Sequence, residues 1–180
     1  MKIFLFLLLC YSSGLGNEIK YNLYLKNPCL NEVEISFNYY LEKDGKQYHI
    51  SDFKTGTVLL PKKGQYILVS TGTGDIQNIQ LNEEVNSDTL TIPRIQEYLV
   101  THDKHGYIFR NCDKPSDGLQ KSYYSDGSIK LIGEFKEGLV VGVLKEFYHN
   151  GKIKQISNYT KDGFLTKTTR FDENGKIIKE

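Results

Sequence analysis

The sequence of 180 residues has no tryptophan, a single methionine, three cysteines and four prolines, and neither charge is in excess. With 23 basic and 22 acidic residues the net charge is +1, which excludes a strongly basic nucleic-acid-binding chain. Hydrophobic residues at 39% against charged residues at 25% exclude a disordered chain. The 13 tyrosines and 9 phenylalanines favour β-sheet over a helical bundle. The length accommodates one ordinary domain or two small ones.

The N-terminus lacks an apolar run long enough to span a bilayer as a helix. After a basic residue, positions 3–9 are uninterruptedly apolar, and Gly14 and Gly16 stand at the −3 and −1 positions of a cleavage site. This order is typical of a secretory signal peptide, so we expect residues 1–16 to be removed and the protein to be periplasmic, cell-surface or secreted. A buried N-terminal strand is the alternative. Lipid anchoring through Cys10 is less favoured, because leucine precedes it where a lipoprotein signal carries a small residue.

Cys29 and Cys112 remain after this segment, and neither belongs to a Cys-x-x-Cys pair or a Cys/His set that would bind zinc. They form either a disulfide or two buried free thiols. Export and their position at the two ends of one compositional block favour the disulfide. Closing a loop of roughly 80 residues would stabilise the fold by about 4 kcal/mol in the chain-entropy model.

Residues 17–113 contain many short segments rich in Tyr, Ile, Val and Phe, separated by Gly, Pro, Asn and Asp, and no helical apolar stripe. Val33–Leu41 has apolar residues at alternate positions, which predicts one half-buried strand, and Gln47–Phe53 predicts another. Between them, the Asp44-Gly45 pair favours a tight hairpin turn. The pattern predicts an all-β fold whose N-terminal domain, residues 17–113, is a β-sandwich.

Within this domain the stretch Gly56–Val69 runs from a strand through a Pro/Gly turn into a strand led by tyrosine, and a further strand segment follows at Asp88–Pro93. It resembles the prealbumin-like or carboxypeptidase-regulatory-like sandwiches that are common in exported bacterial proteins. The resemblance covers about forty residues and implies a sandwich fold outside the cytoplasm, without chemistry.

Residues 114–180 repeat with a period of 24 residues. Gly127, Gly151 and Gly175 each follow an Asp or Asn at this spacing, and Gly118 and Gly142 keep the same offset. An Asp-Gly or Asn-Gly pair between aromatic and aliphatic residues predicts a β-hairpin. Because a single hairpin is marginally stable, adjacent units must stack. We therefore expect an elongated, twisted sheet of successive hairpins.

These residues resemble the bacterial variant of the MORN repeat, most clearly in Phe147–Lys154 and Glu134–Gly138. Leu144 replaces the usual aromatic residue after Gly142, and Asp172 replaces Tyr in the third copy, which indicates degenerate outer units. The resemblance implies scaffold, membrane-proximal or partner-binding roles, and bacterial members include proteins named as antitoxin components. It implies no catalytic residue. The residues expected to form the turns and surface of the repeats are Tyr123, Tyr124, Gly127, Phe135, Gly138, Gly142, Phe147, Tyr148, Gly151, Tyr159, Gly163, Phe171 and Gly175.

One cluster suggests chemistry, since His102, Asp103 and His105 lie within four positions. As a metal site it would need a further ligand, and a polar hairpin tip is the simpler interpretation. The Gly-rich stretch Ser70–Asp75 lacks the lysine and the helix of a phosphate-binding loop and is better explained as a turn. His149 flanks an Asn-Gly turn. We expect no catalytic, cofactor-binding or metal-binding residue.

The near-zero net charge divides into opposite signs. Residues 17–113 carry 10 basic and 13 acidic groups, and residues 114–180 carry 12 basic and 9 acidic groups. The favoured hypothesis is an exported, non-catalytic binding or scaffold protein whose repeat surface engages an unknown protein or cell-envelope component, with peripheral contact to anionic lipid as a further option. The alternatives are a metal-dependent or hydrolytic enzyme that uses the histidine loop, and an immunity-type protein by family resemblance.

Overall fold

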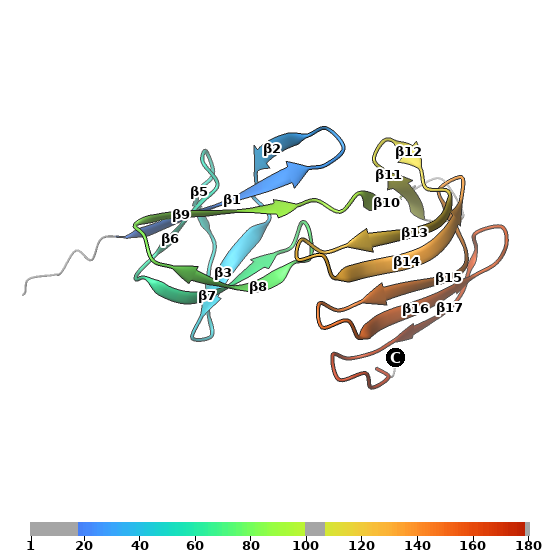
Figure 1. Cartoon of the computed structure of the whole chain (residues 1–180). Helices are drawn as coiled ribbons and strands as arrows, with labels where there is room; N and C mark the ends of the chain where they lie inside the picture. Colours follow the sequence, from blue (N-terminus) through green and yellow to red (C-terminus); the bar gives the residue numbers. More distant parts are fainter. Residues whose placement is uncertain (1–17, 100–106, 179–180) are drawn as a thin grey trace, which may run out of the picture.

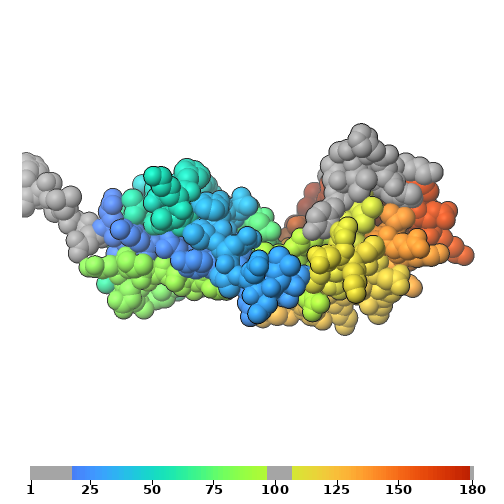
Figure 2. All heavy atoms as spheres, turned by 90° about the horizontal axis from the view of Figure 1, so that it is seen from above, coloured from blue at the N-terminus to red at the C-terminus, as the bar shows by residue number. Residues whose placement is uncertain are grey.

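The computed structural model describes residues 18–99 and 107–178. Within these residues the regular secondary structure consists of β-strands alone (Figure 1). The predicted all-β fold is confirmed. No helix in this part of the chain has the length and apolar character needed to cross a membrane. Seen from above, the N-terminal and C-terminal parts lie end to end along the long axis of the molecule (Figure 2).

The first part is a β-sandwich, and its first sheet is organised around its longest strand. The sheet consists of β1 (Ile19–Asn27), β2 (Glu32–Ile35), β5 (Ile50–Asp52), β6 (Thr57–Leu60) and β9 (Val85–Thr91). Residues 19–22 of β1 pair antiparallel with β6 and residues 24–27 pair antiparallel with β2. The other edge of β1 pairs in parallel with β9. The beginning and the end of the sandwich sequence are thereby bonded to each other.

The second sheet is antiparallel in the order β4-β3-β7-β8. Its strands are β3 (Tyr39–Lys43), β4 (Lys46–Tyr48), β7 (Gly64–Ser70) and β8 (Ile76–Leu81). Asp44 and Gly45 connect β3 to β4 with φ values of 52° and 74°, which confirms the predicted tight turn.

Alternate side chains of the two sheets meet in one core. Tyr21 at its centre is fully buried, and its hydroxyl donates to Asp88 at 2.9 Å. Tyr39 crosses the sandwich, because its hydroxyl donates to the Gly56 carbonyl at 2.6 Å. Both tyrosines therefore satisfy their polar ends inside an apolar interior. The buried members of the core are Ile19, Tyr21, Leu23, Tyr39, Leu41, Val58, Leu60, Tyr66, Leu68, Leu81 and Leu90.

The prediction of a single half-buried strand over Val33–Leu41 was wrong. The segment divides into β2 and β3, which belong to different sheets, because Ser36 bonds to Leu23 in the first sheet and Asn38 to Thr71 in the second. The apolar side chains of β2 face solvent, with Val33 59% exposed. Gln47–Phe53 divides in the same way, into β4 and β5. In both segments one alternating pattern spans two strands, because the chain changes sheets part-way.

The C-terminal part is a five-stranded antiparallel meander in which each strand pairs with the next along the chain. Its strands are β13 (Gly118–Tyr123), β14 (Ile129–Lys136), β15 (Leu139–Phe147), β16 (Ile153–Tyr159) and β17 (Leu165–Arg170). A single bridge between Phe171 and Ile177 begins one more hairpin after β17. This is the arrangement expected of successive hairpin repeats.

A small sheet, β10 (Ile95–Leu99), β11 (Tyr107–Asn111) and β12 (Lys114–Pro115), packs on the meander. Ile95 and Phe109 share a core with Phe135 and its neighbours on β15, and the rings of Phe109 and Phe135 are 5.2 Å apart. The sandwich core ends with β9. The boundary between the two cores therefore lies between β9 and β10, whereas the sequence placed the end of the first domain at residue 113.

Candidate functional site

The repeat sheet is built on a turn that recurs every 24 residues. In the second unit Tyr148 N–H donates to the Lys152 carbonyl at 2.8 Å, and Gly151 N–H donates back to the Tyr148 carbonyl at 2.9 Å. Gly151 has a φ of 76°, in the left-handed region where a Cβ is strained. The same pair of bonds closes the turns around Gly127 and Gly175.

A tyrosine ladder, formed by Tyr124 and Tyr148, joins consecutive units. The Tyr124 hydroxyl donates to the Phe147 carbonyl at 2.7 Å, and the Tyr148 hydroxyl donates to the Phe171 carbonyl at the same distance. Each bond spans 23 residues, so each unit is fixed to its successor. Burial, reinforced by the negative charges of nearby carboxylates, raises the pKa of Tyr124 to about 12. In the third unit Asp172 replaces the tyrosine and accepts two bonds from its own turn, so the ladder ends there.

The glycines at the opposite end of the hairpins make close contacts. Gly138 has a φ of 85°, and a Cβ there would lie 2.6 Å from a methyl group of Ile108 and 3.0 Å from the Phe109 carbonyl. A side chain would push the β10–β11 hairpin off the sheet. Gly163 lies at the equivalent turn of the next unit against Leu139.

Most of the aromatic residues of the repeats pack into the sheet and do not face solvent. Phe135 is 2% exposed, and Tyr159 packs against the same core. Phe147 and Phe171 are half-buried. Tyr123 is 47% exposed and is the one member of the expected aromatic set that offers much of its ring to solvent.

The outer face of the sheet, opposite the buried core, carries lysines in register with aliphatic residues. One cross-strand row consists of Lys121, Ile132, Lys145, Ile156 and Thr169, each directly paired with the next. This row lies on the outer face because the flanking residues Ser122 and Leu144 are buried on the inner one.

A second outer row passes through Val143, Asn158 and Lys167. Val143 is 44% exposed, and Leu119 on β13 is 72% exposed. Three lysines therefore share this face with Glu134. We call these residues the outer lysine face: Leu119, Lys121, Ile132, Glu134, Val143, Lys145, Ile156, Asn158, Lys167 and Thr169.

Comparison with known protein families identifies these units. The MORN repeat variant matches residues 116–137 and residues 140–161. Two units of the sheet therefore match the MORN repeat variant, and we call them the MORN units and their sheet the MORN sheet. The match confirms the resemblance to MORN repeats over these residues. No curated protein and no solved structure matches the chain. The likeness of the sandwich to prealbumin-like domains stays a prediction, since the match does not extend to it.

The first MORN unit is fixed to the sandwich by a polar junction. Asp75, in the loop between β7 and β8, is 2% exposed, and its two carboxylate oxygens accept from the N–H and the hydroxyl of Ser125 at 2.9 and 3.0 Å. Ser125 lies in the turn of the first unit. Its hydroxyl oxygen also accepts a hydrogen bond from the Thr91 N–H at 3.1 Å. The Gly-rich stretch that ends at Asp75 forms a turn, as expected, and also holds the next domain.

His149 extends the junction to the second MORN unit. Its ring stacks on Tyr124 with 3.7 Å between centroids, and its Nε2 accepts from the Ile76 N–H at 3.3 Å. Its Nδ1 lies 3.2 Å from Asp126. The Ser128 hydroxyl, with smaller help from His149, lowers the pKa of Asp126. His149 flanks its turn as expected, but it also bridges two MORN units and the sandwich.

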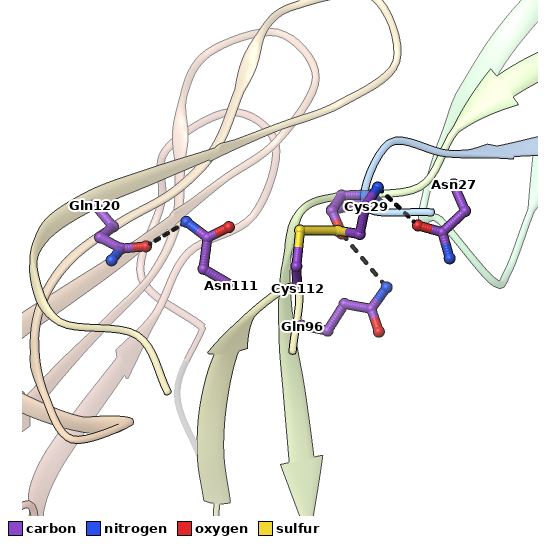
Figure 3. Close-up of a disulfide and its surroundings, with 7 residues drawn as sticks. Asn27, Cys29, Gln96, Asn111, Cys112 and Gln120 are labelled. Carbon is purple, nitrogen blue, oxygen red and sulfur yellow. Dashed lines mark hydrogen bonds between the residues drawn. A yellow bond between two sulfur atoms is a disulfide. The ribbon is translucent and has the colours of Figure 1, made fainter. Parts of the chain in front are cut away.

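A disulfide joins Cys29 and Cys112, with the Cα atoms 5.5 Å apart (Figure 3). Cys29 follows β1, where its N–H donates to the Asn27 side chain at 3.0 Å. Cys112 follows β11 and its N–H donates to the Arg94 carbonyl at 3.0 Å. The expected bond is present. It does not close the sandwich upon itself, because it ties the sandwich to the hairpin that packs on the MORN sheet.

The candidate metal ligands His102, Asp103 and His105 lie outside the described residues. Among residues 18–99 and 107–178 no group of three His, Cys, Asp or Glu side chains is arranged to hold a metal ion. His49 lies beside the ring of Tyr40, 5.4 Å between centroids.

Two features of the MORN sheet were not predicted from the sequence, namely its junction with the sandwich at Asp75 and its outer lysine face. Asp75 gave no signal beyond its place in a Gly-rich loop, and nothing local reports that its partner is 50 residues away. The outer lysine face had a signal in the alternation of Lys121, Lys145 and Lys167 with apolar neighbours, which becomes informative only with the strand register.

Proposed function

We propose that the chain is an exported, non-catalytic binding protein whose outer lysine face engages an acidic protein or an anionic component of the cell envelope. MORN repeats generally act as protein- or membrane-binding modules. The observation that carries the proposal is the register that places Lys121, Lys145 and Lys167 on one face of the sheet among exposed aliphatic side chains. Such a surface attracts anionic partners and adds apolar contact area.

The two faces of the sheet differ in availability. The inner face is covered by the β10–β11 hairpin through Ile95 and Phe109, whereas the outer face has Leu119 72% exposed. The sandwich junction and the disulfide hold the sheet at several points, so the outer face is presented on a rigid support. Export is supported by the disulfide, which persists in oxidising compartments, and by the signal-like N-terminus.

The binding test uses charge reversal rather than deletion, because removing residues 118–180 would also expose Phe109. The test variant is Lys121→Glu/Lys145→Glu/Lys167→Glu. The control, Lys54→Glu/Lys62→Glu/Lys63→Glu, makes the same change in net charge on exposed loops of the sandwich. The measurement is the amount of crosslinked partner recovered from envelope extracts, or of anionic vesicles bound. We expect the control variant to recover as much as the wild type and the test variant to recover about tenfold less or lower still. Equal recovery by both variants contradicts the proposal.

Export has its own measurement. The protein isolated from its source cells should begin at Asn17 and contain no free thiol at Cys29 or Cys112. A chain that retains residues 1–16 and carries reduced cysteines contradicts this half of the proposal.

A further inference from the structure

A cavity of about 350 Å³ lies where the sandwich, the β10–β11 hairpin and the inner face of the MORN sheet meet. It is separate from the outer lysine face, which is on the opposite side of the same sheet. The strand β9 leaves the sandwich at this point and continues into β10 (Figure 1). The lining residues that carry the argument are Ile95, Phe109, Ser122, Lys130, Leu131 and Glu146.

The floor of the cavity is a cross-strand row. Ser122 on β13 pairs with Leu131 on β14, which pairs with Glu146 on β15. Neighbouring strands are about 4.8 Å apart, so the serine and the glutamate flank the leucine at a backbone separation of about 10 Å. Ile95 and Phe109 of the hairpin supply an apolar wall. The site has a hydroxyl at one end, a carboxylate at the other and apolar surface between.

Ser122 is 4% exposed, and its Oγ makes no hydrogen bond within the described part of the protein. A buried hydroxyl normally has a partner, because leaving it unpaired is costly. In the described sheet β13 is an edge strand, and its one neighbour, β14, places Leu131 opposite Ser122, with no polar side-chain atom to offer. Ser122 lines the cavity, and its buried hydroxyl has no partner in the described part of the protein, so a small turn of the side chain would offer it to a ligand.

The charges at the cavity are of two kinds. The Lys130 ammonium donates to the Thr73 carbonyl at 2.5 Å and lies 5.4 Å from the centre of the Tyr124 ring, so it is held within the junction. Glu146 accepts from Gln155 Nε2 through one carboxylate oxygen at 3.0 Å. A carboxylate accepts several hydrogen bonds, so Glu146 retains capacity for a donor in the cavity.

We propose that this cavity binds a small aromatic amine. Its ammonium pairs with Glu146, its flat apolar body lies between Leu131 and Phe109, and a hydroxyl at its far end bonds to Ser122. The volume is in the range of small-molecule sites. This inference does not rest on the proposed function, since the two sites are on opposite faces and involve different residues.

Tyramine is the probe, because it carries an ammonium and a phenol hydroxyl at the two ends of an aromatic ring. The purified, disulfide-bonded protein is titrated and followed by amide NMR shifts and calorimetry. We expect saturable binding with shifts at Ser122, Leu131 and Glu146. Phenethylamine, which lacks the hydroxyl, should bind severalfold more weakly, and 3-(4-hydroxyphenyl)propionate, which has a carboxylate in place of the ammonium, should not bind.

Two variants and a control locate the site. Glu146→Gln should weaken tyramine binding about tenfold or more, since it removes a charge-assisted bond. Glu134→Gln makes the same substitution on the outer face of the same sheet and should leave binding unchanged. Ser122→Ala should abolish the preference for tyramine over phenethylamine, and well-dispersed spectra show that each variant is folded.

The proposal is overturned by any of three results. These are no saturation up to about 10 mM tyramine, equal binding of the propionate analogue, or unchanged affinity in a folded Glu146→Gln variant.

Discussion

Removal of the disulfide between Cys29 and Cys112 is the perturbation whose cost is most directly set by the structure. The two cysteines are 83 positions apart. In the chain-entropy model a loop of this size restricts the unfolded chain by about 4.5 kcal/mol at 25 °C. The bond also joins the sandwich to the hairpin that covers the MORN sheet. The Cys29→Ala/Cys112→Ala variant should therefore be less stable by about 4.5 kcal/mol, which is a large part of the stability of an ordinary domain.

Urea unfolding, followed by tyrosine fluorescence and by circular dichroism, measures this loss. The wild-type protein treated with a reductant is the matched control and should unfold at the same midpoint as the double variant. Without the covalent tie, the two probes should show two transitions, one for the sandwich and one for the MORN sheet. A variant that unfolds in one transition within about 1 kcal/mol of the oxidised wild type would refute the reasoning.

Three further outcomes follow from the repeat architecture. Tyr148→Phe removes the hydroxyl that bonds to Phe171 and should destabilise by about 1 kcal/mol, whereas Tyr123→Phe, on a ring 47% exposed, should change the urea midpoint little; equal effects contradict the ladder. Gly142→Ala meets no atom within 4 Å but has a φ of 75°, so thermal unfolding should reveal a loss of about 1–2 kcal/mol from backbone strain alone, and an unchanged midpoint contradicts it. Since the pKa of Tyr124 is raised to about 12, the fold should keep its contribution below pH 10 and lose it as pH rises towards 12, because the unfolded tyrosine ionises first. Tyr124→Phe should flatten the fall of the urea midpoint over that interval, and an unchanged slope speaks against a buried neutral phenol.

The repeat sheet was the part of the fold most accessible from sequence. The spacing of Gly127, Gly151 and Gly175 predicts where each hairpin turns, because a left-handed residue is required at the same place in each unit. The Asp44-Gly45 turn was predictable for the same reason. Local chemistry fixes such turns without help from distant residues.

Long-range partners could not be predicted in the same way. The alternation around Phe109 indicates a half-buried strand but not which sheet buries it, and it packs on Phe135 of the MORN sheet. Val33 and Phe37 have the pattern of a buried face and are exposed, because the chain crosses between sheets at Ser36. Which surfaces face each other depends on pairings separated by dozens of residues, and a single sequence does not report them.

The candidate site shows the same division. The lysines of the outer face and the polar residues of the cavity alternate along the same strands, so Lys121 and Ser122 are neighbours in sequence but face opposite sides of the sheet. Only the register joins Ser122 to Glu146 and separates both from Lys145. From the sequence we could predict a binding surface on the repeats. The residues that form this surface could be named only once the cross-strand pairing was known.

The tyrosine ladder gives the array a direction of growth. The hydroxyl donor is in the earlier unit and the carbonyl acceptor is in the later one. A unit with Tyr148 in its turn therefore needs a following unit to accept its hydrogen bond, whereas a unit with Asp172 there does not. A duplicated 24-residue unit inserted before Asp172 would inherit a donor and an acceptor and lengthen the sheet without an orphaned hydroxyl. The same unit appended after Asp172 would receive no such bond. Asp172 therefore ends the run of tyrosine hydrogen bonds between the described units, and Asp172→Tyr would supply a donor of the same kind to a further unit.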